Sequence, residues 1–426
     1  MPKEIISLEI GKCGHEIGTA FTNNIIQEWA VYNPLEIPTE SERKSNESAN
    51  PFLSDFKKIL FSSSSSEIHQ RSLYSSIISD IPEASHNWAK GYLQSGQSHG
   101  EEFLDKITTI AEQCESLDNF LLIHSIGGGL GSGLGSFLLN LLSDHFPEIF
   151  RINFSVLPEN SYEVGPYNAV LAMKEMTEYA DCVYQIDNQA LLDIIKKNTE
   201  GNPEINASTN YITMNNIIAS YLSDLTCSIR YQGLLGMSLK EISSNLVPFP
   251  NLQYVSAAKA PISSIINNIH DDKSLVQIFN EITDENSLIK LSSKNSVYLA
   301  NALIFRGNAT IYDIQANTNR LKNSHKMVGW NPENFKLALY NESPLHIPIS
   351  ALKLSNGNSI NSYFSSLKQR FLKLHKKKSF ISSYTQYMDS SLFSSSLSSL
   401  EELMERYTAN TQQLEEPTFS RLKMIV

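Results

Sequence analysis

Apolar residues in the first half of the chain form short runs that alternate with helical patterns. The runs Ile5–Ile10 and Phe120–Ile126 are nearly continuous, which is typical of strands buried on both faces. Lys57–Phe61 and Arg151–Leu157 predict two more strands. Helical spacing follows Phe120–Ile126 at Leu134, Phe137, Leu138, Leu141 and Leu142. This alternation over residues 5 to 200 predicts an α/β domain with a parallel sheet.

The pattern changes in the second half of the chain. A long helix is predicted from about Tyr211 to Ile229, and from Pro261 onward the elements mix as in an α+β domain. Asn295–Thr310 reads as a long apolar strand. Helices are predicted within Ser365–Tyr384 and over Ser390–Tyr407, the second with an apolar stripe.

A glycine cluster lies between the strand Phe120–Ile126 and the helix that follows it. Its sequence over 127–133 is GGGLGSG. A strand, a glycine loop and a helix N-terminus together can bind an anion, because bare amides and the helix dipole face the loop. No G-x-G-x-x-G register and no Gly-Lys-Ser/Thr is present, so neither common nucleotide loop is indicated. Taken alone, a packing turn explains the cluster equally well.

Composition narrows the class of protein. The chain has 426 residues and a net charge of −11, which argues against nucleic acid as the principal partner. Its four cysteines have no metal-type spacing and are expected to be reduced thiols. No apolar stretch of about 18 residues occurs, so we expect no membrane span and a cytoplasmic location.

Several strings match one family in chain order. GGGLGSG resembles the GGGTGSG phosphate loop of tubulins, and GKCGHEIG, residues 11–18, resembles their GQCGNQIG loop. HNWAKGY, residues 86–92, is similar to NNWAKGH, and NLVPFP recurs unchanged at 245–250. LAMKE, IDNQ and YLANALIFRGN are closer to the epsilon branch of the family. The chain is therefore identified as a divergent member of the tubulin superfamily, of epsilon-tubulin type.

The resemblance implies a fold and a division of the chain. The fold class is α/β: a tubulin-type parallel-sheet nucleotide-binding domain, a long connecting helix, an α+β second domain and a C-terminal helical pair. The expected boundaries are 1–210 for the GTP-binding α/β domain, 211–230 for the connecting helix, 231–360 for the α+β intermediate domain and 361–426 for the C-terminal helices.

The resemblance also implies the residues that bind GTP or GDP. Segment 11–18 is expected to be a loop against the phosphates. The implied contacts come from segments that are far apart in the sequence, and they are Gly11, Lys12, Cys13, His86, Asn87, Ser125, Gly128, Gly129, Leu130, Gly131, Ser132, Gly133, Asn188, Tyr211 and Asn215.

The pair Tyr211 and Asn215 lies four residues apart and so shares one helix face, where a ring can stack on a base and an amide can read its edge. For Asn188, a helix cap and a base ligand remain open.

Three departures from the family weaken this site. Leu130 replaces a threonine whose hydroxyl contacts phosphate, and Gly165 replaces a glutamate near the ribose. Ser62–Ser66 replace the acidic loop that holds magnesium through water, so Mg is doubtful and no metal ligand is predicted. Lys12, where the family has glutamine, could offset part of the loss through a charge-assisted bond to phosphate. A solvated lysine is the alternative.

Glu241 is the one candidate catalytic residue. In alpha-type tubulins a glutamate at this position acts in trans, activating water on the neighbour's nucleotide. Ser238-x-x-Glu241 is also a capping box, which explains the same residues structurally. A slow GTPase whose hydrolysis is completed only at a subunit interface is the enzymatic reading.

The function implied is a cytoskeletal subunit that binds guanine nucleotide and serves centriole or basal-body triplet microtubules. Its partners would be other tubulins stacked head to tail, delta-tubulin and centriolar proteins, with no nucleic acid and no membrane. Its location would be the cytoskeleton, at a centriole, centrosome or basal body. The alternative is a tubulin-shaped scaffold with weak or no nucleotide binding and no hydrolysis.

Overall fold

A computed structural model describes residues 4–32, 56–61, 75–78, 84, 86–158, 163–199, 207–231, 233–267, 273–291, 296–331 and 334–412. The serine run Ser62–Ser66 lies outside these residues. The four cysteines are free thiols.

The first half of the chain forms six parallel strands. Their order across the sheet is β3-β2-β1-β4-β5-β6. The strands are β1 Glu4–Ile10, β2 Phe56–Phe61, β3 Ser75–Ile78, β4 Leu117–Ser125, β5 Phe150–Leu157 and β6 Cys182–Asp187. This doubly wound order reverses direction between β1 and β4, and ligands bind at such a reversal, beyond the carboxyl ends of the strands.

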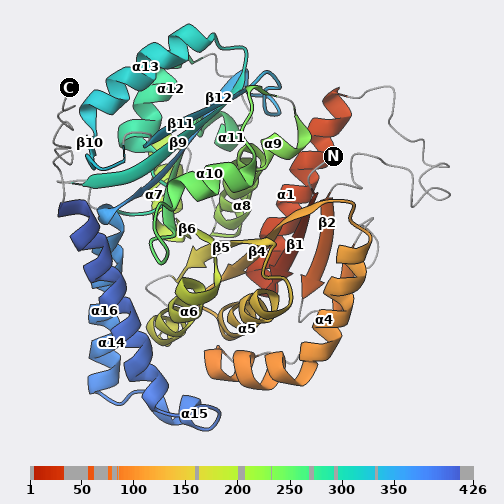
Figure 1. Ribbon diagram of the computed structural model, residues 1–426, viewed down its shortest axis with the longest axis vertical. Helices are drawn as coiled ribbons and strands as arrows, with labels where there is room; N and C mark the ends of the chain where they lie inside the picture. The colour runs from red at the N-terminus through yellow and green to blue at the C-terminus, as the bar shows by residue number, and fades with distance from the viewer. Residues whose placement is uncertain are drawn as a thin grey trace, which may run out of the picture.

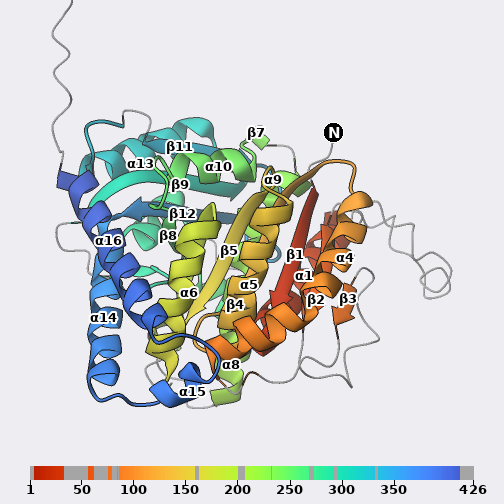
Figure 2. The same ribbon diagram turned by 60° about the horizontal axis from the view of Figure 1, so that its bottom comes forward.

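Helices cover both faces of these strands (Figure 2). One face carries η1 Lys90–Gly96, a π-helix, with α4 Gln97–Glu112, α5 Gly129–His145 and α6 Gly165–Tyr179. The other carries α1 Gly11–Tyr32, α7 Asn188–Asn198 and α8 Ala207–Leu225. Successive strand residues point to opposite faces, so Leu122 joins the first core and Ile123 the second.

The second half extends the same sheet with mixed strand directions (Figure 1). Beyond β6 the order continues β8-β12-β9-β11-β7, with β10 paired to β9. These strands are β7 Gly233–Leu235, β8 Tyr254–Ala260, β9 Val297–Gly307, β10 Lys326–Met327, β11 Phe335–Tyr340 and β12 Ile349–Gly357. The helices around them are α9 Cys227–Arg230, α10 Leu239–Leu246, α11 Ser263–Asn267, α12 Leu275–Asn280, the π-helix η2 Glu281–Glu285 and α13 Ile311–Ser324.

The C-terminal helices pack beside α6, as both views show. They are η3 Asn358–Ile360, a 3-10 turn, then α14 Asn361–Lys376, α15 Ile381–Thr385 and α16 Ser391–Gln412. The ring of Tyr167 on α6 lies 5.3 Å from Phe371 on α14 and 4.9 Å from Phe393 on α16. This aromatic cluster attaches the helices to the first half of the chain.

The predicted fold class is confirmed, and so are the strands expected at Ile5–Ile10, Phe120–Ile126, Arg151–Leu157 and 295–310, within a few residues at their ends. Two predictions were wrong. Segment 11–18 is not a loop, because α1 begins at Gly11 directly after β1.

The helix expected from Tyr211 to Ile229 ends at Leu225 and resumes as α9 after Thr226. Side chains donate hydrogen bonds to backbone carbonyl groups near this break. The Thr226 hydroxyl donates to Leu222 O at 2.8 Å, and Arg230 Nη2 donates to Ser223 O at 2.7 Å.

A cluster of buried charges joins the two halves of the sheet. Arg306 on β9 is fully buried and pairs with Glu28 of α1 at 3.0 Å and with Asp224 of α8 at 3.1 Å. Lys259 of β8, also fully buried, pairs with the same Asp224. Arg230 lies 3.5 Å from Glu28. Burial alone would lower the pKa of Arg306, but the carboxylates of Glu28 and Asp224 outweigh that effect and raise it.

Replacing Arg306 with methionine is expected to lower the free energy of unfolding by about 3–5 kcal/mol. The change removes from the buried carboxylates of Glu28 and Asp224 the cation that they share, and leaves each with one other cationic partner, Arg230 and Lys259. Urea denaturation followed by circular dichroism measures the effect. Arg320→Met on exposed α13 is the matched control, expected to stay within about 0.5 kcal/mol of the parent protein. Equal stability of the two variants would contradict the role of the cluster.

Candidate nucleotide site

Two helix N-termini meet at the reversal point of the sheet. α1 starts at the carboxyl end of β1, and α5 starts four residues beyond the end of β4. Because the amides of a first helical turn lack partners within the helix, both termini present N–H groups and a positive dipole end. The paired strands β1 and β4 therefore direct two anion-binding termini to one place.

Glycine is required where these termini approach each other. Gly11 has φ +72°, a conformation that L side chains rarely adopt, and its ideal Cβ would lie 3.5 Å from the amide of Gly131. A Cβ on Gly131 would meet Ser125 O at 2.6 Å. A side chain at Gly11 would strain the backbone, and one at Gly131 would clash with the carbonyl group of Ser125 at the end of β4. The glycines thus allow backbone amides, rather than side chains, to form the surface.

The start of α5 keeps its amides available. Gly128 is the N-cap and makes no side-chain capping bond, while the Ser125 hydroxyl accepts from Gly127 N at 3.3 Å. Ser132 donates its hydroxyl back to Gly128 O at 2.5 Å, so it braces the turn. Gly129 and Gly133 are buried against the segment 84–92. Leu130 is half-buried and packs against the core that contains α5 and α6.

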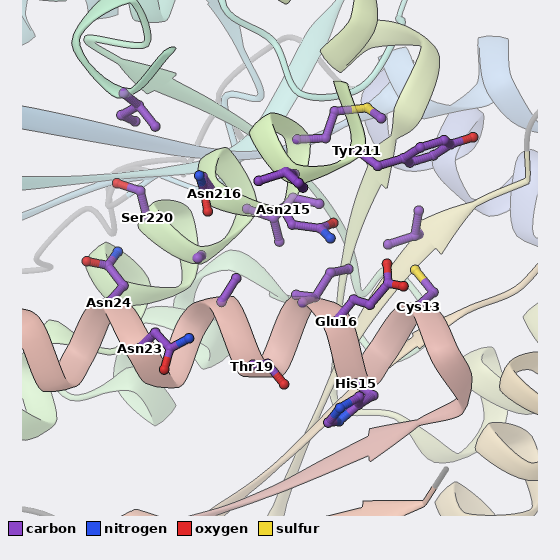
Figure 3. A pocket seen from close by; sticks show the side chains of 18 of the residues that line it. Cys13, His15, Glu16, Thr19, Asn23, Asn24, Tyr211, Asn215, Asn216 and Ser220 are labelled. Carbon is purple, nitrogen blue, oxygen red and sulfur yellow. The ribbon is translucent and has the colours of Figure 1, made fainter. Parts of the chain in front are cut away.

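A cavity of about 1020 Å³ opens beside these turns, between α1 and α8. This is ample for a nucleotide, since ligand pockets usually measure roughly 300–1,000 Å³. It brings together predicted residues from four segments of the chain, and these are Lys12, Cys13, Ser125, Asn188, Tyr211 and Asn215. Figure 3 shows Asn215 directed from α8 toward α1, and Tyr211 at the end of α8 near Cys13 and Glu16.

The part of the cavity lined by α7 and α8 carries an aromatic ring and two amides. Tyr211 is 47% exposed and lies one helical turn before Asn215 on α8. Asn188 is the first residue of α7 and lines the same space. The cap of α7 is Asp187, whose carboxylate accepts from Gln189 N at 2.9 Å. The capping role therefore belongs to Asp187, and Asn188 is left facing the cavity.

Charge at the cavity mouth comes from Lys12 and Glu16. Their charged atoms lie 3.9 Å apart, and the Lys12 side chain is 87% exposed. Water screens such a pair strongly, so Lys12 can move to another anion at little cost. His124 lies below the start of α5 and is fully buried; burial lowers its pKa to about 4. His124 is therefore neutral at pH 7 and adds no positive charge to the site.

His86 and Asn87 do not line this cavity. They line a second cavity of about 530 Å³, together with Phe380 and Tyr387, which lie on either side of α15 in the sequence. The Asn87 side chain accepts from Ala89 N at 2.9 Å and donates to Ser383 O at 2.8 Å, so it braces the turn before η1 and ties it to α15. Its backbone still contacts the glycine turn, residues 127–133, because a Cβ on Gly129 would meet Asn87 N at 2.3 Å.

Glu241 lies outside both cavities, on exposed α10. The capping box with Ser238 is present: Ser238 N donates to Glu241 Oε2 at 2.8 Å, and Glu241 N donates to Ser238 Oγ at 3.2 Å. Within one chain, Glu241 therefore has a structural role at the start of α10.

Sequence analysis missed a polar stripe on α1. Glu16, Thr19, Asn23, Asn24 and Gln27 all line the cavity, and Figure 3 shows Glu16 and Asn24 directed toward α8. Glu16, Thr19, Asn23 and Gln27 are spaced three to four residues apart, and this spacing was the available signal. It went unused because no motif marks it. The described residues hold no group of three or more His, Cys, Asp or Glu suited to a metal ion, and none of their helices could cross a membrane.

Comparison with known proteins agrees with this geometry. Residues 4–196 match the model of the Tubulin/FtsZ family GTPase domain, and residues 250–369 match the tubulin C-terminal domain. The chain is 35% identical to the tubulin epsilon chain of Mus musculus, with 98% of this chain and 99% of that one covered. The human tubulin epsilon chain is also 35% identical, over 94% and 95%. The tubulin beta chain of Saccharomyces cerevisiae is 29% identical, over 98% and 94%.

These matches span both halves of the sheet and the cavity at its reversal point. A GTPase domain of this family implies that a guanine nucleotide is the ligand, and the family is cytoskeletal, with other tubulins as partners. The chain therefore belongs to the tubulin family, as a divergent tubulin of the epsilon type.

Proposed function

We propose that the cavity between α1 and α8 holds GTP or GDP, with the phosphates at the starts of α1 and α5 and the base at Tyr211 and Asn215. The observation that carries this proposal is the convergence of Lys12, Ser125, Asn188, Tyr211 and Asn215 on one cavity. The amides of the two helix termini and Lys12 suit phosphate oxygens. The Tyr211 ring suits stacking, and the amides of Asn188 and Asn215 suit the edge of a guanine.

Magnesium has a smaller part in this proposal than the nucleotide. Among the described residues, Lys12 is the lysine or arginine that lines this cavity, and we infer that it supplies part of the charge that a metal would otherwise supply. A lysine ammonium binds phosphate as a point charge and needs no acidic loop to hold it.

Lys12→Gln, assayed in EDTA, is expected to weaken nucleotide binding roughly tenfold. An unchanged affinity would rule this role out.

Guanine nucleotide is expected to copurify with the protein. Denaturing the protein and separating the supernatant by anion-exchange chromatography measures it, with near-stoichiometric GTP or GDP as the expected result. Asn215→Ala is expected to lower affinity roughly tenfold, because a base contact is lost. Asn319→Ala, at an exposed position of α13, is the matched control and should leave the affinity for guanine nucleotide unchanged. Protein that neither retains nor rebinds GDP would refute nucleotide binding.

A tubulin-shaped scaffold that binds nucleotide weakly and does not hydrolyse it is the second candidate. The position of Leu130 favours it, because this side chain packs into the core and offers no hydroxyl to a phosphate. Protein that carries no nucleotide in the experiment above, and that has normal stability, would support the scaffold function.

We infer that Glu241 acts on the nucleotide of a neighbouring subunit. Its carboxylate lies outside the cavity of its own chain, on an exposed helix start, so only a second chain could bring a nucleotide to it. Head-to-tail stacking of tubulins is a heterologous contact that would supply such a chain. The reaction would be slow GTP hydrolysis, with the carboxylate as base for the attacking water.

Glu241→Gln separates this role from capping. Glutamine also completes a capping box, so α10 should remain intact while the carboxylate is lost. In a coassembly assay with other tubulins, phosphate release is expected to fall roughly a hundredfold or more. Ser238→Ala is the converse control: it breaks the cap and keeps the carboxylate. Loss of hydrolysis in Ser238→Ala but not in Glu241→Gln would refute the catalytic role.

We further propose that the protein serves centriole or basal-body triplet microtubules together with delta-tubulin and centriolar proteins, and so is found at the centrosome and cilium base. Support comes from its similarity to epsilon chains over nearly their whole length. A tagged copy is expected to concentrate at centrioles and to copurify with delta-tubulin. A uniform distribution without delta-tubulin would contradict this.

A further inference from the structure

Asn168 on α6 connects the glycine turn with two other parts of the chain. It is fully buried. Its Nδ2 donates to Gly127 O and to His86 O, both at 2.8 Å. Its Oδ1 accepts from Trp88 N at 3.0 Å and from the Tyr384 hydroxyl at 2.6 Å. One amide thus links the turn after β4, the segment before η1 and α15.

These four bonds use every hydrogen-bonding position of the side chain. A carboxamide has two donor hydrogens and two acceptor lone pairs. Rotating or flipping the amide would leave buried groups unpaired, and this is costly away from water. Asn168 is therefore locked, and it fixes the positions of the three segments relative to one another.

The bond to Gly127 O also sets the direction of the next amide. In a trans peptide the C=O of Gly127 and the N–H of Gly128 share a plane and point opposite ways. Since the carbonyl is held toward Asn168, the Gly128 N–H is turned away from it. A Cβ on Gly128 would meet nothing within 4 Å, whereas at Gly127 it would meet Pro158 at 2.9 Å. The open side of the turn is therefore at Gly128.

We propose that Asn168 and Tyr384 are positioning residues for the glycine turn: they orient the amide of Gly128 without touching the nucleotide. This inference rests on the nucleotide binding proposed above. It assigns a role at the site to the C-terminal helices, because Tyr384 belongs to α15. Burial raises the pKa of Tyr384, so its hydroxyl keeps the proton that it donates to Asn168.

The fold offers a matched control for the Tyr384 hydroxyl. Tyr167 is fully buried in the same aromatic cluster, with its ring 5.6 Å from that of Tyr384. Among the described residues, its hydroxyl has no hydrogen-bond partner. Tyr384→Phe and Tyr167→Phe therefore remove the same atom from neighbouring positions, and only the first removes a bond to Asn168.

The test compares GDP with guanosine, which lacks phosphates. Isothermal titration calorimetry on nucleotide-free protein gives both affinities. Tyr384→Phe is expected to weaken GDP binding about three- to tenfold and to leave guanosine binding unchanged. Tyr167→Phe is expected to change neither. A merely structural defect would lower both affinities together, so the split between the two ligands identifies positioning.

A second variant tests the amide itself. Asn168→Asp keeps the shape of the side chain but cannot donate to Gly127 O, and we expect a larger loss for GDP than in Tyr384→Phe. Thermal unfolding shows whether it folds; if it does not, the tyrosine pair alone decides. Equal GDP affinities of Tyr384→Phe and Tyr167→Phe, or parallel losses for GDP and guanosine, would overturn the inference. Absence of GDP binding in the parent protein would refute the proposed function itself, and this inference with it.

Discussion

The buried charges around Arg306 are the constraint on which the arrangement of the molecule depends. Arg306 belongs to β9, Glu28 to α1 and Asp224 to α8, so one guanidinium ties the intermediate strands to the two helices that enclose the cavity. A buried cation without its carboxylates is far costlier than an unmade surface pair. The spacing of α1 and α8, and with it the width of the cavity, is therefore linked to the second half of the sheet.

The cavity itself follows from strand order. Because the sheet reverses direction between β1 and β4, the helices after these strands diverge to opposite faces and leave their N-termini together. Glycine then allows close approach: Gly11 supplies a positive φ, and Gly131 lies where a Cβ would meet Ser125 O. Backbone amides, a common feature of phosphate sites, can thus be positioned without a charged side chain.

The C-terminal helices have more than a packing role in this arrangement. Tyr167 joins their aromatic residues to α6, and one position later Asn168 joins Tyr384 to the glycine turn. Apolar packing and hydrogen bonding on adjacent residues of α6 therefore place the same elements. The side chain of Asn168 thus connects α15 to the glycine turn through a single buried amide.

The sequence by itself determined the strands β1, β2, β4, β5 and β9, the glycine turn and the family, because apolar runs and contiguous motifs are local properties that one chain displays directly. It also named Tyr211 and Asn215, whose spacing places them on one helix face. Only the tertiary structure decided that Asp187 caps α7 while Asn188 faces the cavity, that Asn87 bonds to Ser383, and that α8 stops at Leu225. It alone revealed Asn168, since each of its partners is at least 41 residues away and no local pattern encodes such a meeting. Local interactions select the elements, whereas contacts between distant residues select which side chains face the ligand.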